Sequence, residues 1–324
     1  MAMNMDRIKK NDIVKRIKKH NAEERGTTDN VSIEELCWLL RQNGLSHSHG
    51  YFHYTTLDRL EGMLEKVDVG EAEKKRLFWL SASTEMNDTQ DNCKGVYVAS
   101  FSYGEEEEVA MWTNYGVPKV KAVRIKFPLR AMMQWAKRNT AKDIKVYVPD
   151  GEKTYRALGI SPVEVYFADV AYYGRNKTAE DERREGVRYL GCGFGLKEAK
   201  WRDSIKNKND ALLFKKRGWA YEKEVRLVVR FKDASITAKH KAIALPFDAL
   251  YDAMLSNVRQ NIVLGPWQNG SLPVSIDGIE NAGRSVFDGE LRMRSNCDKC
   301  KHNKNQKKCS CPYAEWKIAK EECK

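Results

Sequence analysis

The sequence predicts an α+β fold of short strands flanked by helices, and three observations support this class. Apolar and β-branched runs such as Val96–Ser102 and Val225–Phe231 are typical of buried strands. Amphipathic stretches with helical spacing separate these runs, without the regular alternation of a doubly wound fold. Hydrophobic residues make up 42% of the 324 residues and aromatic residues 10%, so the chain can bury a substantial core.

The elements can be assigned in chain order from local patterns. Residues 6–20 place Ile8, Ile13 and Ile17 at helical spacing opposite a basic face. Ser32 and Glu35 form a capping box at the start of a second helix. Further strands are expected at 51–55, 78–81, 96–102, 121–127, 144–148, 163–168, 170–173, 225–231 and 261–265, and further helices at 56–67, 105–116, 128–138, 178–188 and 247–255.

The charge balance points to a polyanionic partner. The chain carries 57 Lys and Arg against 45 Asp and Glu, a formal net charge of +12. A surplus of this size favours nucleic acid over a membrane surface, with general solubility as the alternative. No apolar run approaches the roughly 20 residues that span a bilayer, and the N-terminus has no apolar signal core. We therefore expect a cytoplasmic protein.

Two glutamates precede the predicted strand 225–231. Glu222 and Glu224 are two residues apart, so on a strand both would project from one face, with Lys223 turned away. Two carboxylates on one face are solvated, paired with a cation, or used in chemistry. The alternative to a chemical role is an edge strand with a charged, solvated face.

Four motifs follow one another along residues 50–232. They are His53-Tyr54-Thr55, Asn87-Asp88, Trp112-x-x-Tyr115 and Trp219-x-Tyr-Glu-x-Glu-x-Arg226. This order resembles a widespread bacterial and phage domain family, and it is similar to the mono-ADP-ribosyltransferase superfamily. In that superfamily a histidine or arginine on the first strand and a glutamate on a late strand bracket NAD. The resemblance implies an ADP-ribosyltransferase-like split sheet.

The resemblance also implies roles for individual residues. Glu224 matches the catalytic carboxylate, Glu222 would orient or deprotonate the acceptor, and His53 would donate to a ribose hydroxyl. Ser81 stands on the second strand where the superfamily has a tyrosine. The residues implied to bind NAD are His53, Tyr54, Thr55, Tyr115 and Arg226, where Arg226 would pair with the pyrophosphate or simply neutralise the glutamates.

Basic residues between 197 and 217 suggest the acceptor. Lysines interleave there with Trp201 and Phe214, as on surfaces that track phosphates and stack bases. We expect an RNA or DNA acceptor, as in nucleic-acid-modifying bacterial toxins and phage-defence effectors, and hence an antitoxin partner. The lysines predicted to contact nucleic acid are Lys206, Lys208, Lys215 and Lys216.

Cysteines crowd into the last 28 residues of the chain. In a cytosolic protein such crowding favours metal over disulfides. A Cys-x-x-Cys turn and a Cys-x-Cys turn enclose an apolar-free basic segment, which predicts one structural zinc. His302 or Cys323 could replace a ligand, and a disordered basic tail is the alternative. The predicted zinc ligands are Cys297, Cys300, Cys309 and Cys311.

The sequence thus predicts a basic helical segment over 1–45, an ADP-ribosyltransferase-like domain over 46–290 and a small zinc-binding segment over 291–324. The predicted activity is NAD-dependent transfer of ADP-ribose to nucleic acid. Two alternatives remain open, a non-enzymatic nucleic-acid-binding protein and a metal-dependent nuclease.

Overall fold

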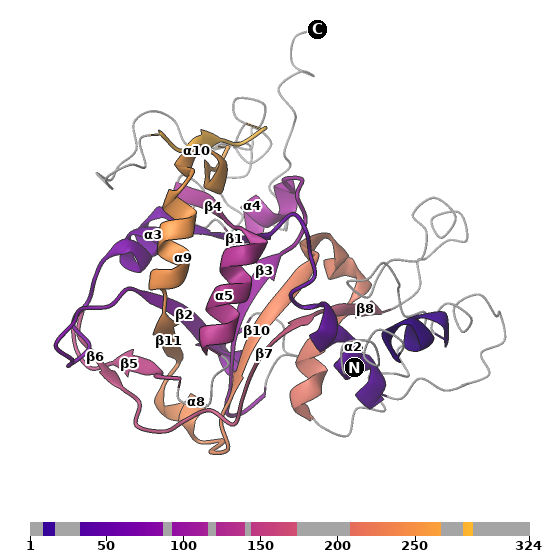
Figure 1. The fold of residues 1–324 in the computed structure, drawn as a ribbon, viewed down its shortest axis with the longest axis horizontal. Coiled ribbons are helices and arrows are strands. Elements are labelled where there is room, and N and C mark those ends of the chain that lie inside the picture. Colours follow the sequence, from indigo (N-terminus) through magenta and orange to yellow (C-terminus); the bar gives the residue numbers. More distant parts are fainter. Residues whose placement is uncertain are drawn as a thin grey trace, which may run out of the picture. The chain divides into compact units, whose positions relative to one another are not determined.

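A computed structural model describes residues 9–16, 33–86, 93–115, 121–139, 144–173, 208–266 and 281–287. Contacts divide the chain into two compact units. The first unit comprises Met1–His53, Gly62–Glu106 and Lys126–Met254, and the second comprises Tyr54–Glu61, Glu107–Ile125 and Leu255–Lys324. The described residues form an α+β fold with a large mixed sheet flanked by helices (Figure 1).

The described strands of the large sheet are mostly short. They are β1 (Tyr51–Thr56), β2 (Leu77–Ala82), β3 (Val96–Ser102), β4 (Ala122–Phe127), β5 (Tyr147–Pro149), β6 (Tyr155–Ala157), β7 (Glu164–Asp169), β10 (Glu224–Arg230), β11 (Ala242–Pro246), β12 (Ile262–Leu264) and β13 (Gly283–Arg284). A separate parallel pair joins β8 (Ala171–Tyr173) to β9 (Phe214–Lys216).

The helices alternate with these strands. Beyond a helix over 9–16, they are α2 (Ile33–Asn43), α3 (Leu57–Leu64), α4 (Val109–Tyr115), α5 (Leu129–Asn139), α8 (Ile236–Lys239), α9 (Asp248–Leu255) and α10 (Val258–Asn261), with 3₁₀ segments η1 (Ser83–Glu85), η4 (Lys208–Leu213) and η5 (Arg217–Glu222).

Strand β10 is an interior strand of the sheet in the first unit. It pairs antiparallel with β3 on one side and with β7 on the other (Figure 1). The other side of β3 pairs with β2 near its start and with β1 at its end, where Phe52 is opposite Ser102. Beyond β2 the order continues through β11, β5 and β6. The interpretation of residues 225–231 as an edge strand is therefore wrong.

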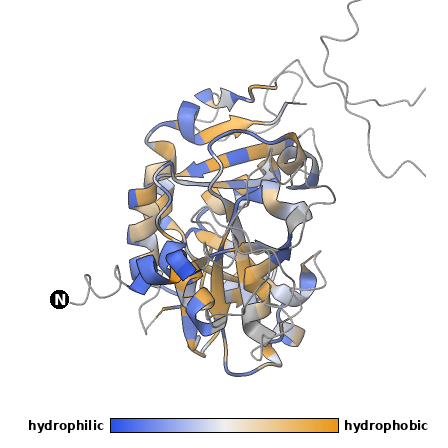
Figure 2. Ribbon diagram, turned by 90° about the vertical axis from the view of Figure 1, so that its right-hand side faces the viewer, coloured by the Kyte–Doolittle hydropathy of each residue, from blue (hydrophilic) through white to orange (hydrophobic). Residues whose placement is uncertain are grey.

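Helices cover both faces of this part of the sheet. Arg41 of α2 stacks on the ring of Tyr166, and Trp135 of α5 packs edge-on against Phe167. Tyr166 and Phe167 are consecutive on β7, so their side chains point to opposite faces. In Figure 2 hydrophobic colour concentrates in the strands, whereas the helices carry both colours. Burial of one apolar stripe per helix thus holds the layers together.

The N-terminal residues belong to this core. Ile13 on the helix over 9–16 is fully buried with the apolar side chains of α2. Arg16 holds Glu35 of α2 through two hydrogen bonds of 3.1 and 2.8 Å. The basic helix therefore packs its apolar side on α2, as its spacing predicts.

In the second unit, β12 pairs antiparallel with β4 and parallel with β13. The predicted helix over 105–116 begins only at Val109. Upstream of it, Glu107 accepts hydrogen bonds from the Trp112 indole at 3.0 Å and the Ser285 hydroxyl at 2.5 Å. The Glu107 carboxylate therefore joins Ser285 to Trp112 of α4 and is not part of the first helical turn.

Candidate functional site

The candidate site lies at the first residue of β10. Segment η5 ends at Glu222, Lys223 adopts a left-handed backbone with φ of 45°, and the strand begins at Glu224. The prediction that both glutamates occupy one strand is therefore wrong, because the left-handed residue separates them. Both carboxylates nevertheless meet at the same lysine, Lys215.

Lys215 comes from β9 and bridges the two glutamates. Its Nζ lies 2.7 Å from Oε2 of Glu222 and 2.8 Å from Oε2 of Glu224. It also lies 5.5 Å from the centre of the Trp219 ring. Only 5% of Lys215 is exposed. The structure therefore places this ammonium in a buried ion pair and not on a surface that would track phosphates.

Arg226 completes the neutralisation of Glu224. Its Nε donates to Oε1 at 2.7 Å and its Nη2 donates to Oε2 at 3.2 Å. Its Nη1 donates to the carbonyl of Leu212. The guanidinium is fully buried. Of the two roles predicted for Arg226, the geometry corresponds to neutralising a glutamate.

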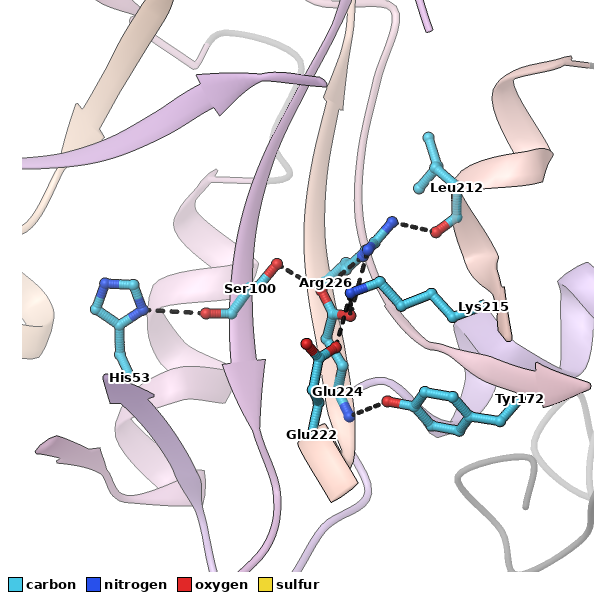
Figure 3. A network of polar contacts seen from close by, with 8 residues as sticks. All are labelled: His53, Ser100, Tyr172, Leu212, Lys215, Glu222, Glu224 and Arg226. Atoms are coloured by element: carbon cyan, nitrogen blue, oxygen red, sulfur yellow. Dashed lines mark hydrogen bonds and ion pairs between the residues drawn. The ribbon is translucent and has the colours of Figure 1, made fainter. Parts of the chain in front are cut away.

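Two further residues fix Glu224 in place. The Ser100 hydroxyl, on the neighbouring strand β3, donates to Oε1 at 2.5 Å. The backbone amide of Glu224 donates to the Tyr172 hydroxyl on β8 at 2.8 Å. Figure 3 shows Ser100, Lys215 and Arg226 converging on this carboxylate. Side chains from β3, β9 and β10 therefore hold the carboxylate, and Tyr172 of β8 holds the backbone of the same residue.

The charges in this cluster support one another. Burial opposes ionisation of Glu224, but Arg226 and Lys215 outweigh it and hold the pKa of this carboxyl well below its ordinary value. Burial likewise opposes the charge of Lys215, yet Glu224 and Glu222 raise the pKa of its ammonium above the usual value. We call Lys215, Glu222, Glu224 and Arg226 the charge cluster. Its two negative and two positive groups balance.

His53 does not join Glu224. Its Nδ1 lies 3.0 Å from the carbonyl oxygen of Ser100 (Figure 3). Its ring contacts Phe78 and Phe101. Phe101 and Ser100 are consecutive on β3, so their side chains point to opposite faces of the sheet. His53 therefore lies on the Phe101 face, whereas the carboxylate of Glu224 lies on the Ser100 face. The predicted bracketing of one ligand by these two side chains is not found.

The remaining residues implied to bind NAD belong to the second unit. The Tyr54 ring packs edge-on against Trp112 at 4.9 Å between centroids. Burial raises the pKa of Tyr54 to about 12. The Thr55 hydroxyl is buried without a hydrogen-bond partner among the described residues. Tyr115 is the last residue of α4 and is partly exposed.

The predicted nucleic-acid surface is described only in part. Lys216 on β9 is exposed, whereas Phe214 is fully buried and stacks no base. The side chain of Lys208 lies outside the described residues, as do Lys206, Trp201 and Asn87-Asp88.

The predicted zinc ligands Cys297, Cys300, Cys309 and Cys311 also lie outside the described residues, with His302 and Cys323. Within the described ranges, no group of three or more His, Cys, Asp or Glu side chains is arranged to hold a metal ion. No helix in these ranges is long and apolar enough to cross a membrane.

The sequence patterns did not identify Ser100 and Tyr172 as partners of Glu224. Ser100 is a polar residue within the largely apolar strand Val96–Ser102, which was a usable signal, since polar side chains in a packed sheet take hydrogen-bond partners. Tyr172 carried no such signal, because its contact depends on where β8 lies.

Comparison of the chain with protein-family models, curated proteins and solved structures gave no match.

Proposed function

We propose that the protein is an NAD-dependent mono-ADP-ribosyltransferase in which Glu224 is the catalytic carboxylate, on an ADP-ribosyltransferase-like sheet. One observation carries the proposal. Glu224 is a buried, ionised carboxylate held in one orientation at a strand end, beside the second carboxylate of Glu222. A fixed negative charge of this kind stabilises positive charge that develops in a transition state.

The chemistry suits this arrangement. Breaking the bond between ribose and nicotinamide creates an oxocarbenium-like centre, as glycoside hydrolysis does. Glu224 would accept a hydrogen bond from a ribose hydroxyl and face that centre. Because Lys215 and Arg226 occupy its oxygens, substrate binding must move the Lys215 ammonium away from Glu224. That displacement would also release Glu222 to orient or deprotonate the acceptor.

The acceptor we propose is RNA or DNA, because the net charge of +12 favours a polyanion. Tyr54, Thr55 and Tyr115 remain proposed contacts of the nicotinamide and nucleotide. His53 is left out of the Glu224 site, because it lies on the other face of the sheet. A role as a toxin or antiviral effector, with an antitoxin as partner, follows from the same proposal.

A second candidate is a non-enzymatic nucleic-acid-binding protein in which the charge cluster is structural. The observation that favours it is the pairing of Glu224, whose oxygens both receive hydrogen bonds from buried cations or hydroxyls. Buried ion pairs of this kind hold elements in register without taking part in chemistry.

Incubation with labelled NAD and RNA, DNA or lysate protein tests the first proposal. Wild-type protein is expected to transfer label, and Glu224→Gln to lower the rate at least about 100-fold, the scale of losing one fixed electrostatic contact. Glu164→Gln is the matched control, because Glu164 also pairs with an arginine of β10 but is partly exposed. Near wild-type transfer by Glu224→Gln would contradict the assignment.

The double variant Glu224→Gln with Arg226→Met separates the two candidates. If the cluster is only structural, the double variant recovers much of the stability that Glu224→Gln loses. In that case neither the wild-type protein nor any variant transfers label. If Glu224 is catalytic, thermal stability is recovered while transfer stays lost. Cleavage of nucleic acid that requires added magnesium would instead support a nuclease.

A further inference from the structure

A second pair of ionisable side chains lies apart from the charge cluster. Nε2 of His47 is 2.6 Å from Oδ1 of Asp169, the last residue of β7. The Asp169 carboxylate is fully buried, and 11% of the His47 side chain is exposed. A short bond between a buried carboxylate and a partly exposed imidazole is the arrangement in which aspartate orients a histidine for proton transfer.

The carboxylate of Asp169 depends on His47 for its hydrogen bond. Oδ2 of Asp169 is buried and has no hydrogen-bond partner among the described residues. Burial raises the pKa of this carboxyl, while the bond to His47 and the charge of Lys10 oppose the rise. An unsatisfied buried oxygen is unfavourable, so its retention requires a reason. Orientation of the imidazole is such a reason.

The imidazole ring is held from two further sides. It stacks on Tyr103 with centroids 4.0 Å apart and planes within 5° of parallel, and it meets Tyr51 edge-on. The backbone is held as well, because the His47 amide donates to the Tyr51 hydroxyl at 3.4 Å and the Gly50 amide donates to the His47 carbonyl at 3.3 Å. The ring therefore has little freedom to turn.

The second ring nitrogen is not used by this framework. No described residue forms a hydrogen bond with Nδ1 of His47, and Nδ1 is not among the buried polar atoms that lack a partner. Because 11% of the His47 side chain is exposed, Nδ1 is the ring nitrogen that a ligand would meet. When Nε2 carries the hydrogen that Asp169 accepts, Nδ1 presents a lone pair.

We propose that His47 is a general base for a hydroxyl compound, with Asp169 as its positioning residue. Nδ1 takes the proton of a bound O–H while that oxygen forms a bond to an electrophilic carbon. With water and an activated ester, the new bond joins the water oxygen to the acyl carbon, the ester C–O bond breaks and the alkoxide or phenolate leaves. The proton then passes from Nδ1 to solvent.

This proposal is independent of the role of Glu224. Asp169 is opposite Val225 in the register of β7 and β10, so both side chains point to the face away from Glu224. His47 reaches β7 from the loop between α2 and β1, and none of its contacts is to the charge cluster. Loss of either activity would leave the other testable.

Hydrolysis of 4-nitrophenyl acetate by the full chain provides the test. His47→Gln is expected to lower the rate constant at least tenfold, and Asp169→Asn to lower it by a similar factor because the amide no longer enforces the Nε2–H tautomer. The neighbouring pair His49 and Glu105, whose Nδ1 and Oε2 are 3.0 Å apart, is largely exposed and supplies matched controls. His49→Gln and Glu105→Gln should change the rate less than twofold.

A measurement on the unaltered protein keeps the proposal falsifiable if a variant fails to fold. Long-range ¹H–¹⁵N spectra of the histidine rings report which nitrogen carries the hydrogen. We expect Nε2–H with a bare Nδ1 for His47, and a shift toward Nδ1–H in folded Asp169→Asn. A neutral His47 with its hydrogen on Nδ1, or an esterase rate equal in wild type and folded His47→Gln, would overturn the proposal.

Discussion

At the scale of single residues, two cations stabilise the negative charge of the buried Glu224 carboxylate. A glutamate buried to this extent is strongly destabilised as an anion unless it is paired and hydrogen-bonded. Arg226 contacts both carboxylate oxygens of Glu224, whereas Lys215 contacts one oxygen through its ammonium. The two cations therefore differ in how readily a substrate could displace them from Glu224. A planar guanidinium held at both carboxylate oxygens is the more rigid partner. Lys215 is accordingly the residue we expect a substrate to displace.

The lowered pKa of Glu224 predicts how stability depends on pH. Its contribution is present in full above the ordinary glutamate pKa, about 4.3, and is lost as pH falls toward the lower folded value. Glu224→Gln should therefore reduce the free energy of unfolding by about 3–5 kcal/mol at pH 7, because the buried Arg226 loses its carboxylate partner and Lys215 keeps only Glu222. Urea unfolding at several pH values should show this gap shrinking below about pH 4.

Glu164→Gln again serves as the control, since a partly exposed ion pair contributes less than about 1 kcal/mol. A gap between wild type and Glu224→Gln that stayed constant from neutral to acid pH would show that this carboxyl does not carry the pH dependence.

At the scale of elements, the contact between α2 and β7 positions the loop that carries His47. The helix ends where Gly44 lies directly against the backbone of Phe167, and a Cβ at Gly44 would be 2.5 Å from the Phe167 carbonyl carbon. This close approach starts the loop that carries His47 toward Asp169. Gly44, the residue directly after α2, is thus needed for packing against β7.

Gly44→Ala tests this contact. The methyl group meets backbone that cannot move aside cheaply, so we expect loss of at least about 1–3 kcal/mol of unfolding free energy. Gly62→Ala is the matched control, because Gly62 lies within α3 and a methyl group added there would have nothing within 4 Å. That change should stabilise the helix by up to about 1 kcal/mol. Denaturant unfolding of the two variants should move in opposite directions, and equal effects would contradict the packing role of Gly44.

At the scale of the whole molecule, the net charge and the cysteine-rich segment both involve residues that the structure does not describe. The surplus of +12 belongs to the entire chain, and the buried ammonium and guanidinium of the charge cluster are already balanced by carboxylates. Lys215 is thus no part of an exposed basic surface. The proposed contact with nucleic acid therefore relies on other cations, of which Lys216 is an exposed example.

The cysteine-rich segment predicts one zinc per chain with no direct part in catalysis. Cys297, Cys300, Cys309 and Cys311 supply four sulfurs, the ligand set of a structural zinc site. Elemental analysis of protein purified without chelator should give one zinc per chain, and chelation should release it and expose the thiols. A ratio near zero, with these thiols freely titratable in the untreated protein, would remove the site. Transfer and esterase activities should survive chelation.

Local pattern by itself determined most of the elements. Strand β3 has the predicted bounds, Val96–Ser102, because a largely apolar run is stabilised by burial inside a sheet. Helix α2 follows its apolar spacing and begins at Ile33, the residue after the predicted cap Ser32, because its apolar stripe must be buried. Strand β11 went unpredicted, since the short run Ala242–Pro246 is stabilised by pairing with β2 and β5 rather than by its own pattern.

The candidate sites were decided by tertiary structure. The sequence identified Glu222 and Glu224 as unusual, but their neutralisation by Lys215 depends on the position of β9. His53 and Glu224 were expected together and lie on opposite faces, because a strand changes face at every residue and only the register between strands sets which side chains meet. Nothing local linked His47 to Asp169, 122 residues apart. The sequence specifies the type of each side chain, whereas residues that are distant in the sequence come close together only when the strands pair.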